Sequence, residues 1–158
     1  MKDWENQQPP QADRQEHALL GACLLTPAAI ADAVDTGLQT HHFRITHLAA
    51  LWEAIQQAWA RGEPVDIITI KPAAANAHKA YIGAAGDELL IDILDANEVA
   101  GHASYYASVI IEAATKRAAY DIALKAAQNP DKAPQILAEA EQLQTYSTPT
   151  LHLSLIHI

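Results

Sequence analysis

The sequence is poor in cysteine and in basic residues. Its 158 residues include a single cysteine, Cys23, so no disulfide can form within the chain. Lysine and arginine total 10 against 19 acidic residues, which gives a formal net charge of −9. Because an acidic surface repels phosphate backbones, we do not expect this chain to bind DNA or RNA by itself.

Long apolar runs are also missing. The first residues, MKDWENQQPPQADRQE, are polar and lack the apolar centre of a secretory signal. No apolar stretch approaches the roughly 20 residues that cross a bilayer. We therefore expect a cytoplasmic protein without membrane association. Half of the residues are hydrophobic, which is enough for the core of one compact domain.

Motifs for catalysis and nucleotide binding are absent from the sequence. It contains no GxxxxGK[ST] loop, no glycine-rich nucleotide fingerprint, no HExxH and no paired cysteines. Cys23 falls on an apolar helix face, which is typical of a core residue. The polar side of one predicted helix carries Asp87, Glu88, Asp92 and Asp95, the pattern of a solvated face. We expect no catalytic residue, cofactor or metal in this segment.

Apolar spacing in the first third of the chain predicts helices. Asp13 and Glu16 have the spacing of a capping box and open a helix through RQEHALLGACLL. Thr26 and Pro27 begin a second helix, which Gly37 ends. A third helix, from about residue 46 to 61, has an apolar face made of Leu48, Leu51, Trp52, Ile55 and Trp59.

The middle of the chain is harder to assign. VDIITI could be a short strand or a buried extended connector, with Thr69 capping a following helix that tolerates Pro72 in its first turn. Gly83 and Gly86 predict a turn. DELLIDILDA then predicts an amphipathic helix that buries Leu89, Leu90, Ile93 and Leu94.

The last third of the chain predicts a helical hairpin. After Gly101, about 27 residues contain no proline or glycine, which corresponds to roughly 40 Å of helix. Asn129-Pro130 interrupts it, and Pro134 starts a second helix through QILAEAEQLQTY. A lone hairpin cannot cover its own apolar surface, so it packs on the first part of the chain or on another copy. The width of the apolar stripe favours another copy, with candidate interface residues Tyr105, Tyr106, Val109, Ile110, Ile122, Leu137 and Leu143.

These patterns divide the chain into segments. We expect a disordered lead over residues 1–12, a globular helical subdomain over 13–100, a helical hairpin over 101–146 and the start of a linker over 147–152. The last six residues, LSLIHI (153–158), resemble the translation of a transposon end used as a sequencing adaptor. We therefore exclude them from the fold and expect the natural protein to continue beyond His152.

Three histidines lie close together in THHFRITHLAALWEAI, and two hypotheses account for them. They could bind a metal, as in a small metal-dependent enzyme, or they could mark a loop that leads into a helix. His41 and His42 are adjacent and their rings diverge in most backbones, and no ligand spacing typical of zinc sites is present. We favour the loop, with Phe43 inserted into the core and His47 in the first helical turn, bonded to a carbonyl or carboxylate.

Four motifs together resemble the N-terminal domain of DnaB-type replicative DNA helicases. They are Glu16 with LLGACLL, then HFRITHLAALWEAI, then GEPVDIITI, and finally YYASVIIEAATKR. The resemblance runs from about Pro10 to Gln144. It identifies Phe43, His47, Trp52 and Asp66 as structural signature residues rather than catalytic ones. The sequence departs from the family pattern in IGAAGDELL, in EVAGHAS and in the alanine-rich stretch around Pro72.

The resemblance implies an all-α fold, a small globular helical bundle followed by a long helical hairpin. It implies that hairpins pair between subunits and that the dimers form a ring of six, which holds DNA in its channel and receives primase and helicase loader. ATP and magnesium are expected only in the C-terminal motor domain, which this segment lacks. The alternative is a stand-alone adaptor module of the same fold, associated with a helicase or primase and without a motor.

Overall fold

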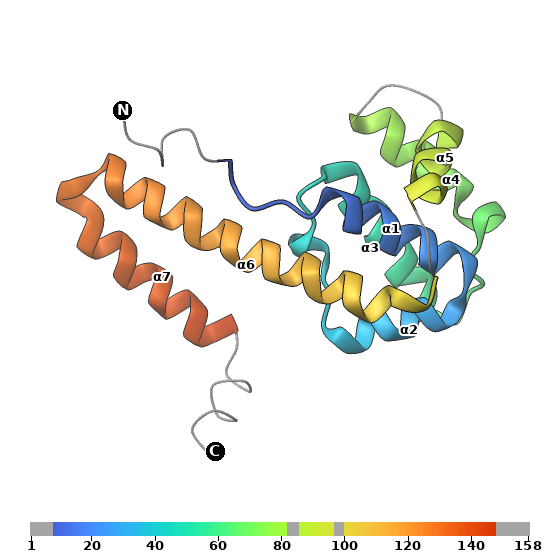
Figure 1. Cartoon of the computed structure of the whole chain (residues 1–158), viewed down its shortest axis with the longest axis horizontal. Coiled ribbons are helices and arrows are strands. Elements are labelled where there is room, and N and C mark those ends of the chain that lie inside the picture. Colours follow the sequence, from blue (N-terminus) through green and yellow to red (C-terminus); the bar gives the residue numbers. More distant parts are fainter. Residues whose placement is uncertain (1–7, 82–85, 97–99, 148–158) are drawn as a thin grey trace, which may run out of the picture. The chain divides into compact units, whose positions relative to one another are not determined.

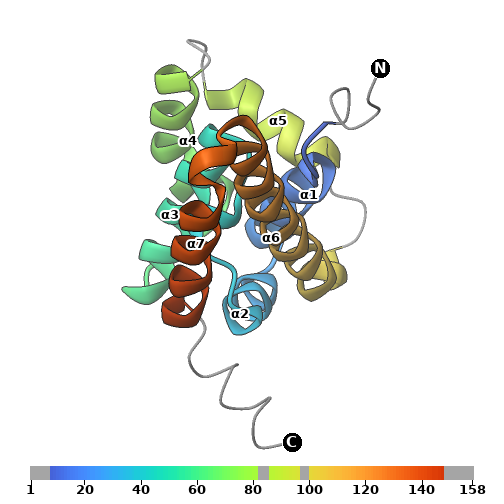
Figure 2. The same ribbon diagram turned by 90° about the vertical axis from the view of Figure 1, so that its left-hand side faces the viewer.

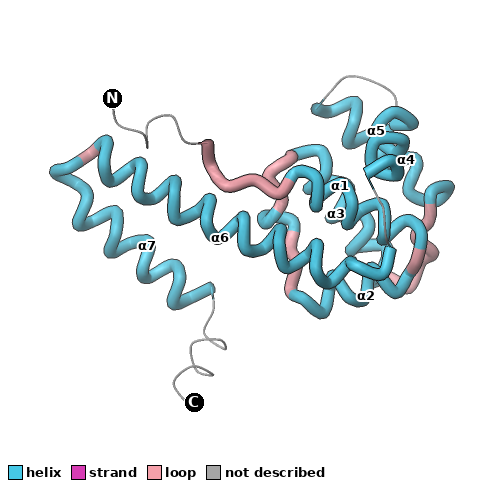
Figure 3. Tube along the Cα trace, in the orientation of Figure 1, coloured by secondary structure: helices cyan, strands magenta, loops and turns pink. Residues whose placement is uncertain are grey.

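The computed structural model describes the backbone of residues 8–81, 86–96 and 100–147, and the side chains of 8–76, 88–95 and 101–142. Within these ranges the chain forms helices joined by loops and turns, without a strand (Figures 1 and 3). The prediction of an all-α fold is therefore confirmed. The expected lead, the predicted turn at Gly83, the linker and the last six residues lie wholly or largely outside the described residues.

The helices follow one another closely along the chain. Their order is α1 (Asp13–Leu25), α2 (Pro27–Thr36), η2 (Thr40–His42), α3 (Thr46–Ala60), α4 (Ile67–Tyr81), α5 (Gly86–Ala96), η3 (Ala100–His102), α6 (Ala103–Gln128), η4 (Pro130–Lys132) and α7 (Ala133–Ser147). The η elements are single turns of 3-10 helix. None of the described helices is long and apolar enough to span a membrane.

The chain divides into two units, residues 1–115 and 116–158. The division falls inside α6, at Thr115, whereas the sequence predicted a globular part that ends at residue 100. In the first unit α5 packs against α1 and α4, α4 packs against α3, and α1 also contacts α2 and α3. In the second unit α7 returns alongside the end of α6 after the turn at Asn129 (Figures 1 and 2).

The core of the first unit is aliphatic and comes from several helices. Its fully buried large side chains are Leu19, Leu20, Ile30, Leu38, Leu48, Leu51, Trp52, Ile55, Leu89, Ile93 and Ile110. The apolar faces predicted for the third helix and for DELLIDILDA are confirmed at most positions. Two positions differ, because Trp59 is 37% exposed and Leu94 is only half-buried.

Two of the predicted helix ends are confirmed. Thr26 is the N-cap of α2 and Pro27 is its first residue, where a missing N–H costs nothing. Gly37 ends α2 in the left-handed conformation, with φ at 91°, and its N–H bonds the carbonyls of Ala33 and Val34. This is the conformation that glycine adopts without steric cost.

Two predictions about where helices begin are wrong. The N-cap of α1 is Ala12, without a side-chain cap, and Glu16 is fully buried instead of closing a capping box. The segment VDIITI is neither a strand nor a connector, since α4 begins at Ile67 and Ile68 is 83% exposed. Pro72 consequently lies inside α4 rather than in its first turn.

Candidate self-association surface

The first half of α6 belongs to the globular unit. Ile110 is fully buried in the core of this unit, together with Ala103, Ala107 and Ala113, while Tyr106 and Val109 are partly buried against the same core. The prediction that Ile110 lies at an interface is therefore wrong, because its own unit already covers it. Among the predicted interface residues of this half, Tyr105 remains accessible, with 64% of its surface exposed.

The second half of α6 has apolar side chains on two faces. Tyr120 and Leu124 are half-buried and one turn apart, whereas Ile122 is half-buried and about 200° away from Tyr120 around the helix. A single neighbouring helix covers only one of these faces. The hairpin therefore has apolar surface left over after α7 has been placed beside α6.

Helix α7 also has half-buried apolar side chains along one face. Ala133, Ile136 and Ala140 are half-buried at helical spacing, and Leu137 lies next to them with 53% of its surface exposed. Leu143, which was also predicted to lie at the interface, is outside the described side chains. No side chain described between residues 116 and 142 is buried, so this part of the unit has no core of its own.

The two units also differ in charge. Residues 1–115 contain 6 basic and 15 acidic residues, a net of −9, whereas residues 116–158 contain 4 of each, a net of zero. Like charges on two copies of the globular unit repel each other. A neutral hairpin adds no such repulsion, so apolar contact between hairpins of two copies is opposed only weakly by electrostatics.

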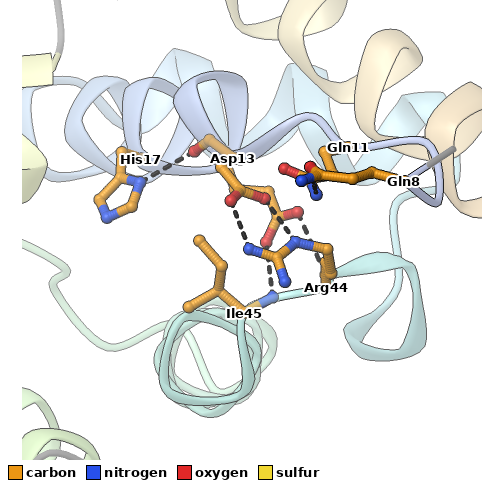
Figure 4. A network of polar contacts seen from close by, with 7 residues as sticks. Gln8, Gln11, Asp13, His17, Arg44 and Ile45 are labelled. Atoms are coloured by element: carbon orange, nitrogen blue, oxygen red, sulfur yellow. Dashed lines mark hydrogen bonds and ion pairs between the residues drawn. The ribbon is translucent and has the colours of Figure 1, made fainter. Parts of the chain in front are cut away.

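The loop before α3 is held by Glu16, for which the sequence predicts a place in a local cap. The buried Glu16 carboxylate accepts hydrogen bonds from the backbone N–H groups of Arg44 and Ile45, both at 3.1 Å (Figure 4). Two donors satisfy this carboxylate in the interior, where an unpaired charge would be costly. The polar clamp, as we call Asp13, Glu16, Arg44 and Ile45, joins α1 to the start of α3.

Asp13 forms the exposed part of the polar clamp. The Arg44 guanidinium donates from Nε to Asp13 Oδ1 at 2.7 Å and from Nη2 to Asp13 Oδ2 (Figure 4). The hydrogen bond to Asp13 raises the pKa of Arg44 above its ordinary value, although burial acts in the opposite direction. Since both side chains are about one-third exposed, this ion pair is worth less than the buried contacts of Glu16.

Of the signature residues in the histidine segment, Phe43 and Trp52 lie in the core and His47 lies at the start of α3. Phe43 is 7% exposed and its ring lies 6.2 Å from that of Trp52, which is fully buried. Phe43 thus enters the core where the loop turns into α3, as predicted. His47 is half-buried in the first turn of α3, also as predicted. The bonding of His47 to a carbonyl or carboxylate stays a prediction.

Asp66 caps α4. Its Oδ1 accepts the N–H groups of Ile68 and Thr69, at 2.9 and 2.8 Å, and Thr69 Oγ1 accepts the N–H of Asp66 at 2.9 Å. This reciprocal pair is a capping box, whereas the sequence predicted such a box at Asp13 and Glu16 and Thr69 as the cap of the helix. The backbone hydrogen bond from Thr69 is the main cause that lowers the pKa of Asp66.

The described side chains offer little for catalysis. They contain no group of three or more histidine, cysteine or acidic residues placed to hold a metal ion. His41 and His42 instead lie ring against ring, with centroids 4.2 Å apart. Burial and, to a smaller extent, the charge of Asp32 together raise the pKa of the Cys23 thiol to about 12, so this thiol is a core group rather than a nucleophile.

The family model of the DnaB-like helicase N terminal domain matches residues 8–112, about two-thirds of the chain. The chain belongs to this family. The match includes the polar clamp, the segment from Phe43 to Trp52, the Asp66 cap and α6 as far as Glu112. The resemblance seen in the sequence is therefore confirmed.

Known replicative DNA helicases share this similarity over most of the chain. The replicative DNA helicase DnaB of Geobacillus stearothermophilus is 32% identical over 139 residues, which cover 85% of this chain and 30% of that protein. The replicative DNA helicase DnaC of Bacillus subtilis is 31% identical over the same length. The chain thus spans about 30% of the length of these relatives.

A solved structure has the same fold. The N-terminal domain of DnaB helicase from Mycobacterium tuberculosis matches with a TM-score of 0.74 and 26% sequence identity, over 89% of this chain and all of that one. In fold and in sequence, this chain is thus a member of the DnaB-like helicase N-terminal domain family.

Proposed function

We propose that this DnaB N-terminal domain is the collar of a cytoplasmic replicative helicase and acts by self-association through its hairpin. The observation that carries the proposal is the absence of any buried side chain among the described residues 116–142. A hairpin that buries none of its own side chains has to gain burial elsewhere. The neutral charge of residues 116–158 supports a second copy of the same chain as the partner.

In the parent protein, the paired domains form part of a ring of six. The ring holds DNA in its channel, so this acidic domain does not have to bind DNA itself. The collar receives primase and the helicase loader, and ATP and magnesium act in a C-terminal motor domain. Support for these assignments comes from the family and from the relatives, of which the chain covers about 30%.

Sedimentation velocity tests self-association through the hairpin. We expect Leu137→Asp to shift the chain toward the monomer, because it places a charge in the apolar contact. Gln142→Asp is the matched control, since Gln142 is exposed on the same helix about 140° away from Leu137. Equal masses for both variants and the unmodified chain, with the fold intact, would contradict the proposal.

The motor domain is tested by sequencing the source DNA beyond the codon for His152. An open frame that leads through a linker into a GxxxxGK[ST] loop supports a helicase collar. A stop codon directly after this point contradicts it and favours an adaptor module of the same fold. This result does not affect the sedimentation test, which concerns the hairpin alone.

A further inference from the structure

The turn before α3 depends on an uncharged histidine. The N–H of Gln39 donates to His42 Nδ1 at 2.9 Å, and the side chain of Gln39 accepts the N–H of His42 in return. An imidazole nitrogen accepts a hydrogen bond only when it carries no proton. The ring of His42 is therefore neutral in this turn, with its proton on Nε2.

The same segment is fixed at its other end by a different helix. Glu16 of α1 binds the N–H groups of Arg44 and Ile45, and Asp13 binds the guanidinium of Arg44. Phe43 lies between the two attachments and contacts the core through Trp52. Residues 39–45, which we call the latch, are thus held at one end by His42 and at the other by the polar clamp.

We propose that the latch is pH-sensitive: protonation of His42 removes the acceptor for the N–H of Gln39 and loosens the N-terminal end of the latch. The backbone bond from the N–H of His42 to the carbonyl of Gln39, at 3.0 Å, does not depend on this proton and keeps the turn from opening fully. Histidine changes its charge between about pH 5 and 8, so mild acidification is sufficient. The polar clamp keeps Arg44 and Ile45 in place during this step. Opening then loosens the backbone next to Phe43 without unfolding the globular unit.

Several charged or titratable groups surround the latch. On the turn itself, the ring centroid of His41 lies 4.2 Å from that of His42. On α3, Gln56 lines the same hollow as Gln39, Thr40 and His41, and the titratable residues of this helix are His47 and Glu53. On α1, Asp13, Glu16 and His17 lie around the clamped end (Figure 4).

Nuclear magnetic resonance of the full chain tests the latch. We expect the long-range nitrogen spectrum at pH 7.5 to show His42 with its proton on Nε2. Between pH 7.5 and 5.5, we expect the protection factor of the Gln39 amide to fall about tenfold, the size of one lost hydrogen bond. His42→Asn keeps an acceptor that does not titrate, so in this variant the protection factor of the Gln39 amide should stay constant within about twofold.

His41→Asn is the matched control, because it removes a titrating ring from the same turn and leaves the acceptor in place. In this variant, the protection factor of the Gln39 amide should fall between pH 7.5 and 5.5 as it does in the unmodified chain. A proton on Nδ1 of His42 at pH 7.5 would overturn the proposal, and this readout needs no variant. Constant protection in the unmodified chain, or an undiminished loss in His42→Asn, would also overturn it.

Discussion

The two units of this chain are stabilised in different ways. Residues 1–115 have an aliphatic core, a buried carboxylate with two donors and all of the net negative charge. Residues 116–142 have no buried side chain and residues 116–158 have no net charge. The first unit is therefore expected to be stable by itself, whereas the second depends on a partner. Substitutions in the two units should consequently affect different properties.

Ile110→Asp is expected to have the largest effect on the stability of the globular unit, and Leu137→Asp serves as its counterpart in the hairpin. A charge at the fully buried Ile110 should destabilise the globular unit by about 4 kcal/mol or more, whereas Leu137→Asp should leave its unfolding midpoint nearly unchanged. The Cys23 thiol reports on this unit, because it is buried and reacts only when the unit opens.

Labelling of Cys23 with a thiol reagent in increasing urea therefore measures the stability of the globular unit in both variants. Ile110→Asp should make Cys23 reactive at a much lower urea concentration, while Leu137→Asp should not. If both substitutions shifted the urea midpoint equally, the hairpin and the globular unit would unfold as one cooperative unit. This result would contradict the view that the two units are stabilised in different ways.

A smaller loss of stability is expected from Glu16→Ala. It leaves the part-buried N–H groups of Arg44 and Ile45 without their carboxylate, which should cost about 2–4 kcal/mol. Glu16→Gln is the matched control, because its amide retains one acceptor oxygen and should lose less. Urea unfolding followed by circular dichroism measures both, and equal stability of Glu16→Ala and the unmodified chain would exclude a stabilising role for the clamp.

The Asp66 cap should contribute in a pH-dependent manner. The pKa of Asp66 is lowered in the folded chain, so its stabilisation is present above the ordinary aspartate range and is lost as pH falls through the lowered value. Asp66→Ala should thus lower the thermal midpoint at pH 7, with a difference that vanishes in strong acid. A difference that persisted unchanged to pH 2 would rule out the carboxylate as its source.

The smallest effect is expected from Arg44→Ala. The ion pair with Asp13 is about one-third exposed, so its loss should cost about 0.5–1 kcal/mol, well below the loss for Glu16→Ala. Because salt screens exposed charges, the difference should shrink in 1 M sodium chloride. A loss for Arg44→Ala as large as that for Glu16→Ala would place the strength of the clamp in the ion pair instead.

Local patterns in the sequence predicted most of the helices. Proline and glycine mark α2 at both ends, and the apolar spacing of Leu48, Leu51 and Ile55 defines α3, because these signals act within a few residues. The start of α4 was missed because VDIITI is rich in β-branched residues, which favour strands. The Asp66–Thr69 pair, which has capping-box spacing, was the signal that could have located it.

Long-range contacts could not be predicted in this way. Glu16 binds backbone groups 28 and 29 residues away, and no local spacing indicates that contact. Similarly, an apolar stripe on α6 shows that something covers it, but not what. For Ile110 the cover is the globular unit of the same chain, whereas for Leu137 it stays a prediction that a second copy supplies it.

We infer that the hairpin gains its burial from a second copy of the chain. Amide hydrogen exchange at two protein concentrations, one above and one below the dissociation constant for self-association, tests it most directly. We predict that residues 116–142 lose protection on dilution while α1 and α3 keep theirs. Equal protection of residues 116–142 at both concentrations would contradict the claim.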